Sequence, residues 1–115
     1  MAIDTRARSL RKLTRLMKAL RAGIDPTVPI QVVQTFLVVA VNEGTTLTDI
    51  ASTSGANLST VSRHTIDLGE RNRRMGPGYG LIESRTDPMS LRTKNYSLSQ
   101  KGRLFVDGLI STLED

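Results

Sequence analysis

Apolar residues near the start of the chain recur every three or four positions, which is the spacing of one face of an α-helix. This spacing predicts a helix over residues 4–22, which Gly23 would end. Basic side chains surround its apolar stripe of Leu10, Leu13, Met17 and Leu20. An amphipathic helix must bury such a stripe, either against the core of its own chain or against a second copy of it. A third interpretation, a helix lying on a membrane surface, is weaker because the stripe lacks Trp and Phe.

Residues 30–43 predict a second helix that is apolar on most of its sides. Pro29 suits the first turn of a helix, and Gly44 is a stop signal. A β-strand competes for this valine-rich run, but the length of the run favours a helix. We expect the following residues of this helix to enter the core: Ile30, Val33, Phe36, Leu37, Ala40 and Val41.

Residues 47–68 are typical of a helix-turn-helix. A short helix capped by Thr48 would be followed by a turn at Gly55 and by a second helix capped by Ser59. In such a unit the second helix lies in the major groove of DNA and presents its N-terminal side chains to the bases. We expect its inner face to carry Val61, Thr65 and Leu68, with Leu58 packing just ahead of it.

Two short strands follow, over residues 81–85 and 94–98, with a turn over residues 86–93 that Asp87-Pro88 signals. A last helix over residues 100–113, capped by Ser99, has an apolar side formed by Leu104, Phe105, Leu109 and Leu113. The order helix, helix, helix-turn-helix, hairpin, helix predicts a mostly α fold with a small β-hairpin wing (α+β). This fold class is the winged helix-turn-helix.

Composition favours a polyanionic partner and offers little for catalysis. The formal net charge is +5 and the pI is near 10.2, which suits binding to phosphates. With no cysteine and one histidine, the chain has neither a disulfide nor a thiolate or histidine-cluster metal site. No phosphate-binding loop, H-E-x-x-H motif or catalytic triad is visible. We therefore expect no enzyme activity, no cofactor and no metal.

The longest apolar run, residues 36–41, is too short to span a bilayer, so we expect no membrane insertion. The absence of cysteine fits the cytoplasm. Basic residues crowd the first segment and the last third of the chain, and between these two regions only Arg63 is basic. Arg63 lies in the second helix of the helix-turn-helix, where a DNA-binding function would need it.

Two motifs stand in order along the second half of the chain. Residues 59–63 read STVSR, and residues 80–102 read GLIESRTDPMSLRTKNYSLSQKG. Together they resemble the recognition helix and the wing of the multiple-antibiotic-resistance regulator (MarR) family of winged-helix repressors. The resemblance covers about residues 28–105, and the wing matches at Gly80, Leu81, Ile82, Asp87, Pro88, Arg92, Leu98, Lys101 and Gly102.

The chain departs from the family pattern at two places. Ser90 and Leu91 stand where the family usually has Asp and Arg, and that Asp usually orients the arginine of the wing tip. The loop over residues 71–79 is longer than the family's direct connection from the recognition helix to the wing.

We expect the DNA contacts to come from the second helix, the following loop and the wing. Hydroxyl groups near a helix N-terminus can bind phosphate, and Arg63 can donate two hydrogen bonds to guanine. An ion pair of Arg63 with Asp67 is the alternative, and His64 points either to DNA or to the inner helix. The wing cations could also be solvated, as could those of the loop. The predicted DNA-binding residues are Ser59, Thr60, Ser62, Arg63, His64, Arg73, Arg74, Arg85, Arg92 and Lys94.

The resemblance implies a cytoplasmic, nucleoid-associated homodimer that binds double-stranded DNA as a transcriptional repressor and responds to a small-molecule effector. We expect residues 1–23 to form a basic helix for dimerisation or DNA contact, and residues 24–103 to form the winged-helix domain. Residues 104–115 would end a C-terminal helix that contributes to the dimer. The predicted dimer interface comprises Leu10, Leu13, Met17, Leu20, Leu109 and Leu113.

Two other functions stay open at this point. The chain could be a sequence-tolerant architectural or accessory DNA-binding protein of a plasmid, phage or chromosome, with the basic first helix coating DNA. It could also be a protein-interaction module whose basic helix binds an acidic partner. RNA binding is less favoured, because aromatic residues that could stack on unpaired bases are only 3% of the chain.

Overall fold

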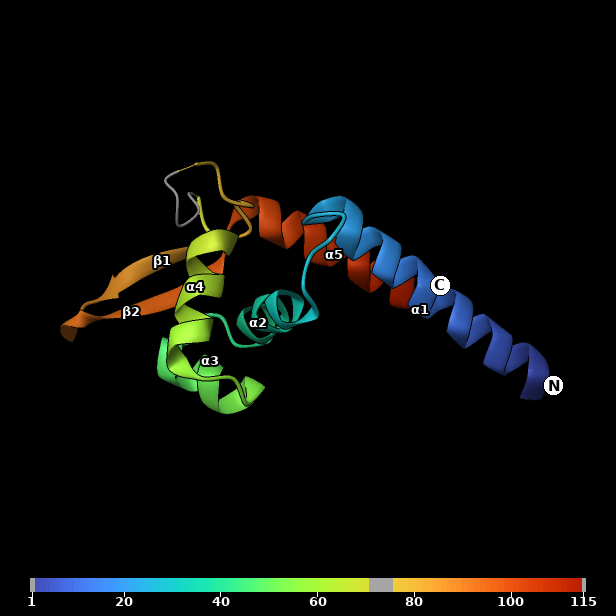
Figure 1. The fold of residues 1–115 in the computed structure, drawn as a ribbon, viewed down its shortest axis with the longest axis horizontal. Helices are drawn as coiled ribbons and strands as arrows, with labels where there is room; N and C mark the ends of the chain where they lie inside the picture. The colour runs from blue at the N-terminus through green and yellow to red at the C-terminus, as the bar shows by residue number, and fades with distance from the viewer. Residues whose placement is uncertain (1, 71–75, 115) are drawn as a thin grey trace. The chain divides into compact units, whose positions relative to one another are not determined.

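Within residues 2–70 and 76–114, which the computed structural model describes, helices and a hairpin follow one another in the predicted order (Figure 1). The elements are α1 (Ala2–Gly23), α2 (Ile30–Val41), α3 (Leu47–Ser54), α4 (Leu58–Leu68), β1 (Ile82–Asp87), β2 (Ser90–Leu98) and α5 (Gln100–Glu114). Arg73 and Arg74, two of the predicted DNA contacts, lie outside the described residues.

The chain divides into two compact units. One comprises Pro29–Arg103, which hold α2 to α4, the hairpin and the first residues of α5. The other comprises Met1–Val28 and Leu104–Asp115, which hold α1 and the remainder of α5. We call them the winged-helix unit and the helical unit.

The core of the winged-helix unit forms where α2, α3 and α4 contact one another. Phe36 of α2, Ile50 of α3 and Val61 of α4 have no exposed surface. Each such burial stabilises the fold by about 1.5–3 kcal/mol. The predicted inner face of the second helix is confirmed, because Val61, Thr65 and Leu68 are all buried.

Helix α2 buries a narrower face than its composition suggested. Its buried residues are Val32, Val33, Thr35, Phe36 and Val39. Ile30 is 73% exposed, Leu37 is 40% exposed and Val41 is 80% exposed, so the prediction that these three enter the core was wrong. The reason is that α3, α4 and β2 supply neighbours for only part of the helix surface.

Both helices of the helix-turn-helix begin earlier than predicted. The hydroxyl of Thr46, not of Thr48, caps α3 by accepting a hydrogen bond from the backbone N–H of Asp49 at 3.2 Å. The α4 helix is capped by the side-chain oxygen of Asn57, not by Ser59. Gly55 ends α3 as predicted, with a φ of 76° that favours glycine.

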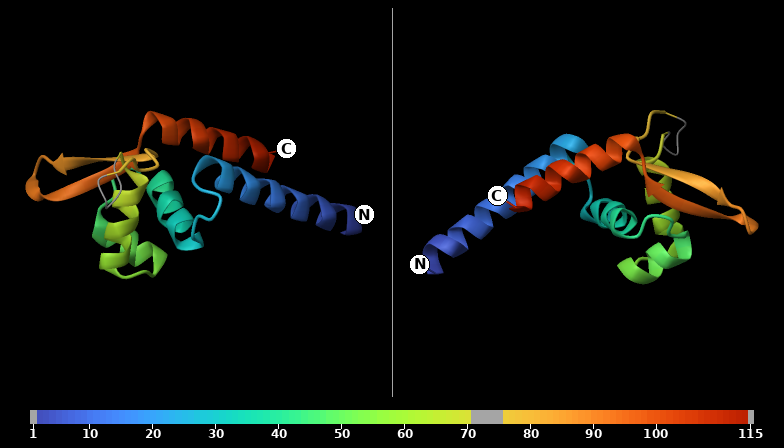
Figure 2. Two further views of the ribbon diagram at one scale, coloured as in Figure 1. Left: turned by 45° about the horizontal axis from the view of Figure 1, so that its top comes forward. Right: turned by 180° about the vertical axis from the view of Figure 1, so that it is seen from behind.

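The hairpin is confirmed, but its turn is shorter than predicted. The strands pair antiparallel from Ile82 and Leu98 to Thr86 and Lys94, with a register shift after Thr86. They then continue to a two-residue connection at residues 88–89, so the predicted turn over residues 86–93 was too long. The hairpin projects away from α2, α3 and α4 in both further views (Figure 2).

A backbone bridge joins the hairpin to the link between α2 and α3. Tyr96 donates its N–H to the carbonyl of Thr45 at 2.8 Å, and Gly44 donates to the carbonyl of Tyr96 at 2.8 Å. The link thus meets the edge of the sheet at Thr45, and α3 begins two residues later at Leu47.

Glu43, just after the end of α2, strengthens this joint. Its Oε1 accepts a hydrogen bond from the backbone N–H of Leu98 at 3.0 Å, and its Oε2 lies 2.9 Å from Nη1 of Arg103. One carboxylate therefore connects the link after α2 to the end of β2 and the start of α5.

The start of α5 is held equally closely against the start of the wing. Ser99 caps α5 as predicted, accepting from the N–H of Gly102 at 3.0 Å while donating to the carbonyl of Gly80 at 2.6 Å. A Cβ on Gly102 would overlap the carbonyl oxygen of Leu81, so only glycine permits this approach. These contacts fix the base of the wing.

The segment that leads into β1 returns along the end of α4. Four backbone N–H groups, from Gly78, Tyr79, Gly80 and Leu81, donate at 2.8–3.0 Å to the carbonyls of Glu70, Asp67, Gly69 and Leu68. Two of these carbonyls, those of Asp67 and Leu68, belong to the last turn of α4, where a helix end leaves carbonyls without partners. The four bonds also close the base of the long loop, so the wing starts at a fixed place beside α4.

In the helical unit, α1 and the later residues of α5 lie side by side and antiparallel (Figure 2). Lys12 donates from Nζ to the carbonyl of Leu113 at 3.0 Å, and a Cβ on Gly23 would overlap the ring of Phe105. Leu20 and Leu109 are buried. Among the described residues no helix combines the length and hydrophobicity needed to cross a membrane.

The predicted dimer interface divides into two groups. Leu20 and Leu109 are 8% and 7% exposed within the single chain. The exposed members are Leu10 at 55%, Leu13 at 55%, Met17 at 46% and Leu113 at 55%. Leu104, which was predicted on the apolar side of the last helix, is 67% exposed.

Candidate nucleic-acid interface

The outer face of α4 is polar and carries one cation. Ser59 and Arg63 are exposed, four residues apart, and Thr60 and Ser62 are half-buried between them. Ile66, three residues beyond Arg63, is 44% exposed and continues the same face. The buried residues Val61, Thr65 and Leu68 hold the opposite face in the core, so the helical period presents Ser59 and Arg63 to the outside.

Asn57 organises the N-terminus of this helix, a role that the sequence-based reading assigned to Ser59. Its Oδ1 accepts one hydrogen bond from the backbone N–H of Thr60 at 2.8 Å and another from the hydroxyl of Ser59 at 2.9 Å. The hydroxyl of Ser59 is thereby oriented, and its oxygen can still accept a hydrogen bond. The signal for Asn57 was present, since Asn is among the strongest capping residues.

The guanidinium group of Arg63 is exposed on this face. Among the residues that the structure describes, no ion pair joins Arg63 to Asp67, which was the alternative to a DNA contact. An arginine held on a helix and facing outward presents a planar set of donors that suits phosphate or the edge of guanine.

His64 turns to the inner side of α4. Its Nδ1 lies 2.9 Å from the hydroxyl of Thr35 on α2, and the ring is half-buried. Thr35 itself is 1% exposed. Of the two orientations that the sequence allowed, this contact matches the one toward the inner helix.

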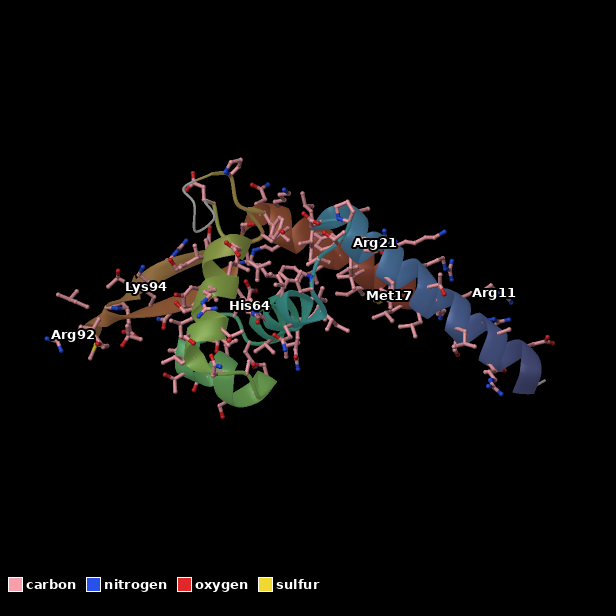
Figure 3. All side chains as sticks on the ribbon, viewed as in Figure 1. Arg11, Met17, Arg21, His64, Arg92 and Lys94 are labelled. Carbon is pink, nitrogen blue, oxygen red and sulfur yellow. The ribbon has the colours of Figure 1, made fainter. Side chains whose placement is uncertain are left out.

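The wing carries exposed cations along its length. Arg92 lies near the far end of the hairpin and Lys94 lies closer to the helices (Figure 3). Arg85 approaches Glu83 at 3.8 Å, but their side chains are 86% and 48% exposed. An ion pair this exposed contributes little, so Arg85 can readily exchange it for a phosphate.

The tip of the wing also carries two large apolar side chains, of which the sequence analysis named only Leu91, as a departure from the family pattern, and not Met89. Met89 is 92% exposed and Leu91 is 87% exposed. The turn around them is ordered by Asp87, whose Oδ1 accepts a hydrogen bond from the N–H of Met89 at 2.7 Å. The match of Asp87 and Pro88 to the family wing predicted a turn here, but it did not predict that the tip of the turn would be apolar.

Among the described residues, no group of three or more His, Cys, Asp or Glu side chains could hold a metal ion. The described part of this surface carries hydrogen-bond donors and positive charges on α4 and on the wing. The α4 helix and the wing both belong to the winged-helix unit.

The fold has well-defined relatives among solved structures, whereas the sequence matches neither a protein-family model nor a curated protein. A mutant of S. aureus MepR bound to an oligodeoxyribonucleotide aligns with 98% of this chain and 75% of its own, with a TM-score of 0.71 and 21% identity. Streptococcus pneumoniae FabT in complex with DNA aligns with 99% of this chain and 76% of its own, with a TM-score of 0.60 and 19% identity.

A third solved structure carries the family name that the two sequence motifs suggested. It is a MarR family transcription regulator that aligns with 96% of this chain and 69% of its own, with a TM-score of 0.62 and 19% identity. The similarity in each case extends well beyond the helix-turn-helix. The chain therefore has the winged helix-turn-helix fold of the MarR-type transcriptional regulators.

Proposed function

We propose that this protein is a transcriptional regulator, acting as a repressor, that binds double-stranded DNA through α4 and the wing. The observation that carries the proposal is the exposed guanidinium of Arg63 beside Ser59 on the outer face of α4. The exposed side chains of Arg92 and Lys94 on the wing of the same unit support it. MepR and FabT, which share the fold, have been solved with DNA bound. Such a regulator would act in the cytoplasm, on the nucleoid.

In this proposal α4 lies in the major groove. Arg63 donates to the O6 and N7 atoms of guanine, and the exposed Ser59 meets a phosphate near the helix N-terminus. Arg85, Arg92 and Lys94 neutralise phosphates along the flank of the site. His64 supports α4 from behind through Thr35, and so it belongs to the scaffold of the interface more than to its surface.

We further propose that the protein binds as a homodimer through the helical unit. Leu10, Leu13 and Met17 form a stripe on α1 that stays about half exposed in the single chain, and Leu113 of α5 is equally exposed. Four large apolar side chains left in water favour burial against a second copy. Leu20 and Leu109 support this surface from inside. Two-fold symmetry then predicts a pseudo-palindromic site.

Selection from a pool of random duplexes with the whole chain tests the proposal. We expect enrichment of a pseudo-palindrome, and fluorescence anisotropy should show binding to it at physiological salt that is at least about a thousandfold tighter than to random DNA. The Arg63→Ala/Arg92→Ala double variant should lose this preference, whereas Lys18→Ala, which removes an exposed cation from α1, should keep it. Absence of binding to any duplex at low salt would refute the proposal. Repression itself is tested by placing the selected site in a reporter promoter.

A second candidate is a sequence-tolerant architectural DNA-binding protein. It is favoured by a line of exposed basic residues on α1 at helical spacing: Arg8, Arg11, Arg15 and Lys18. The same selection separates the two candidates, because a flat sequence profile with steep salt dependence would favour the architectural role. In that case Lys18→Ala would weaken binding as much as Arg92→Ala.

A further inference from the structure

The wing tip is unusual in being both apolar and almost wholly exposed. Met89 at 92% and Leu91 at 87% are the two most exposed large hydrophobic residues of the described chain, and the neighbouring Pro88 is exposed as well. Single exposed apolar residues are common on protein surfaces, but here they gather within four positions at the end of a projecting hairpin. A cluster of this kind commonly marks a binding surface.

The tip is pre-ordered by polar contacts behind the apolar side chains. Asp87 accepts hydrogen bonds through Oδ1 from the N–H of Met89 at 2.7 Å and through Oδ2 from Nδ2 of Asn95 at 3.4 Å. The hydroxyl of Thr93 donates to that of Ser90 at 3.2 Å. Both oxygens of the Asp87 carboxylate therefore form hydrogen bonds within the wing. Because the tip is already ordered, binding costs it less conformational entropy.

The charges next to the tip are positive. Arg92 adjoins Leu91 in the chain, and Lys94 and Arg85 lie further down the two strands, all of them exposed. Apolar side chains that end a basic hairpin fit a narrow groove that is edged by phosphates and gives access to the apolar faces of stacked bases. The minor groove of DNA, about 6 Å wide between two phosphate backbones, is such a partner.

We propose that Met89 and Leu91 form an apolar wedge that enters the minor groove and partly unstacks a base step, while Arg92 and Lys94 hold the adjacent phosphates. Met, Leu and Pro are among the residues that minor-groove proteins use in this way, and insertion bends the duplex toward the major groove. The inference rests on the proposed function. It adds that the wing deforms DNA. Binding sites are then selected by how easily a base step unstacks, so specificity arises even where no side chain contacts a base edge.

The experiment uses a duplex recovered by selection with the whole, unaltered chain and labelled with a donor and an acceptor dye at its two ends. Energy transfer between the dyes reports bending, and anisotropy reports affinity. The variant is Met89→Gln/Leu91→Gln, which keeps the size of the tip and removes its apolar character. Val41→Ala is the control, since Val41 is 80% exposed and lies at the end of α2, outside the wing tip.

We expect the unaltered protein and Val41→Ala to bend the duplex by between about 20° and 90°. The glutamine variant should leave the duplex nearly straight and bind on the order of tenfold more weakly, with its salt dependence unchanged because no charge was removed. Circular dichroism of each variant checks that the fold is retained.

The outcomes separate the wedge from the proposed function. If the unaltered protein binds the duplex without bending it, or if the glutamine variant bends it equally, the wedge is wrong and the DNA-binding proposal stands. If the unaltered protein selects no duplex at all, the proposed function fails and the wedge fails with it. A glutamine variant that loses both affinity and helical signal would be replaced by Met89→Ala and Leu91→Ala singly, and unchanged bending in both would also overturn the wedge.

Discussion

The hydroxyl of Thr35 on α2 lies 2.9 Å from Nδ1 of His64 on α4, and Thr35 is almost completely buried. This contact crosses the interface between the central helix of the core and the helix that carries Arg63. A partly buried polar pair of this kind is costly to break, because the group left behind loses a partner in a place that water reaches poorly. It therefore helps to fix the rotation of α4 about its axis, which decides which side chains face outward.

Replacing Thr35 with valine should lower the free energy of unfolding by about 1–3 kcal/mol, because the half-buried ring nitrogen of His64 loses this partner. Urea unfolding followed by circular dichroism measures the change. Thr53→Val is the matched control, since Thr53 is exposed on α3 and its hydroxyl is not buried. An equal effect of the two substitutions would show that the contact with His64 contributes nothing.

Replacing Arg63 with alanine should weaken binding to the selected duplex by about 1–3 kcal/mol and relax the base preference at one position of each half-site. Arg63→Lys keeps the charge and loses the two-pronged donor, so it should bind random DNA as the unaltered protein does but should still lack the base preference. Competition anisotropy with duplexes altered at single positions measures both. If alanine weakens binding to specific and random DNA equally, Arg63 contacts a phosphate and reads no base.

Replacing Arg92 with alanine should lower the slope of log affinity against log salt by about 1, with little change in base preference. The physical reason is that one contact with a phosphate releases about one condensed counterion. Titrations at several salt concentrations give the slope directly. An unchanged slope together with an unchanged affinity would remove the wing from the proposed interface.

Two glycines of α5 should respond to alanine in opposite ways. Gly102→Ala should destabilise the protein by about 3 kcal/mol, since the added Cβ would overlap the carbonyl oxygen of Leu81, which belongs to the backbone. Gly108→Ala should stabilise it by about 0.5–1 kcal/mol, because nothing lies within 4 Å of that Cβ and alanine favours the helix. Thermal and urea unfolding of the two variants measure the contrast, and a tolerated Gly102→Ala would contradict the close packing of α5 on the wing base.

Introducing charge into the exposed stripe of α1 should separate the proposed dimer. Leu13→Glu/Met17→Glu places two charges on side chains that are 55% and 46% exposed in the single chain, so the isolated chain should still fold. Light scattering and sedimentation should then report a monomer with weaker DNA binding. Arg8→Glu changes the charge at an exposed position on the opposite side of α1 and should leave a dimer. A monomeric unaltered protein would refute this part of the proposal at once.

The sequence by itself was sufficient for the order and type of the elements. Helical spacing predicted the inner face of α4 at Val61, Thr65 and Leu68, and glycine predicted the end of α3 at Gly55. These features depend on neighbours a few positions away, so they can be read locally. The motif at residues 80–102 likewise predicted the wing, although pairing of the strands shortened its turn.

The tertiary structure decided which of several equivalent residues acts. Polar residues stand side by side at both helix starts, and the path of the backbone selected Thr46 and Asn57 as caps over Thr48 and Ser59. The adjacent residues Arg63 and His64 of α4 point in different directions. His64 contacts the buried hydroxyl of Thr35, whereas Arg63 is exposed. The number of packed neighbours left Ile30 and Val41 exposed although α2 is apolar on most sides. Burial depends on contacts between residues far apart in the chain, and a local pattern carries no information about these.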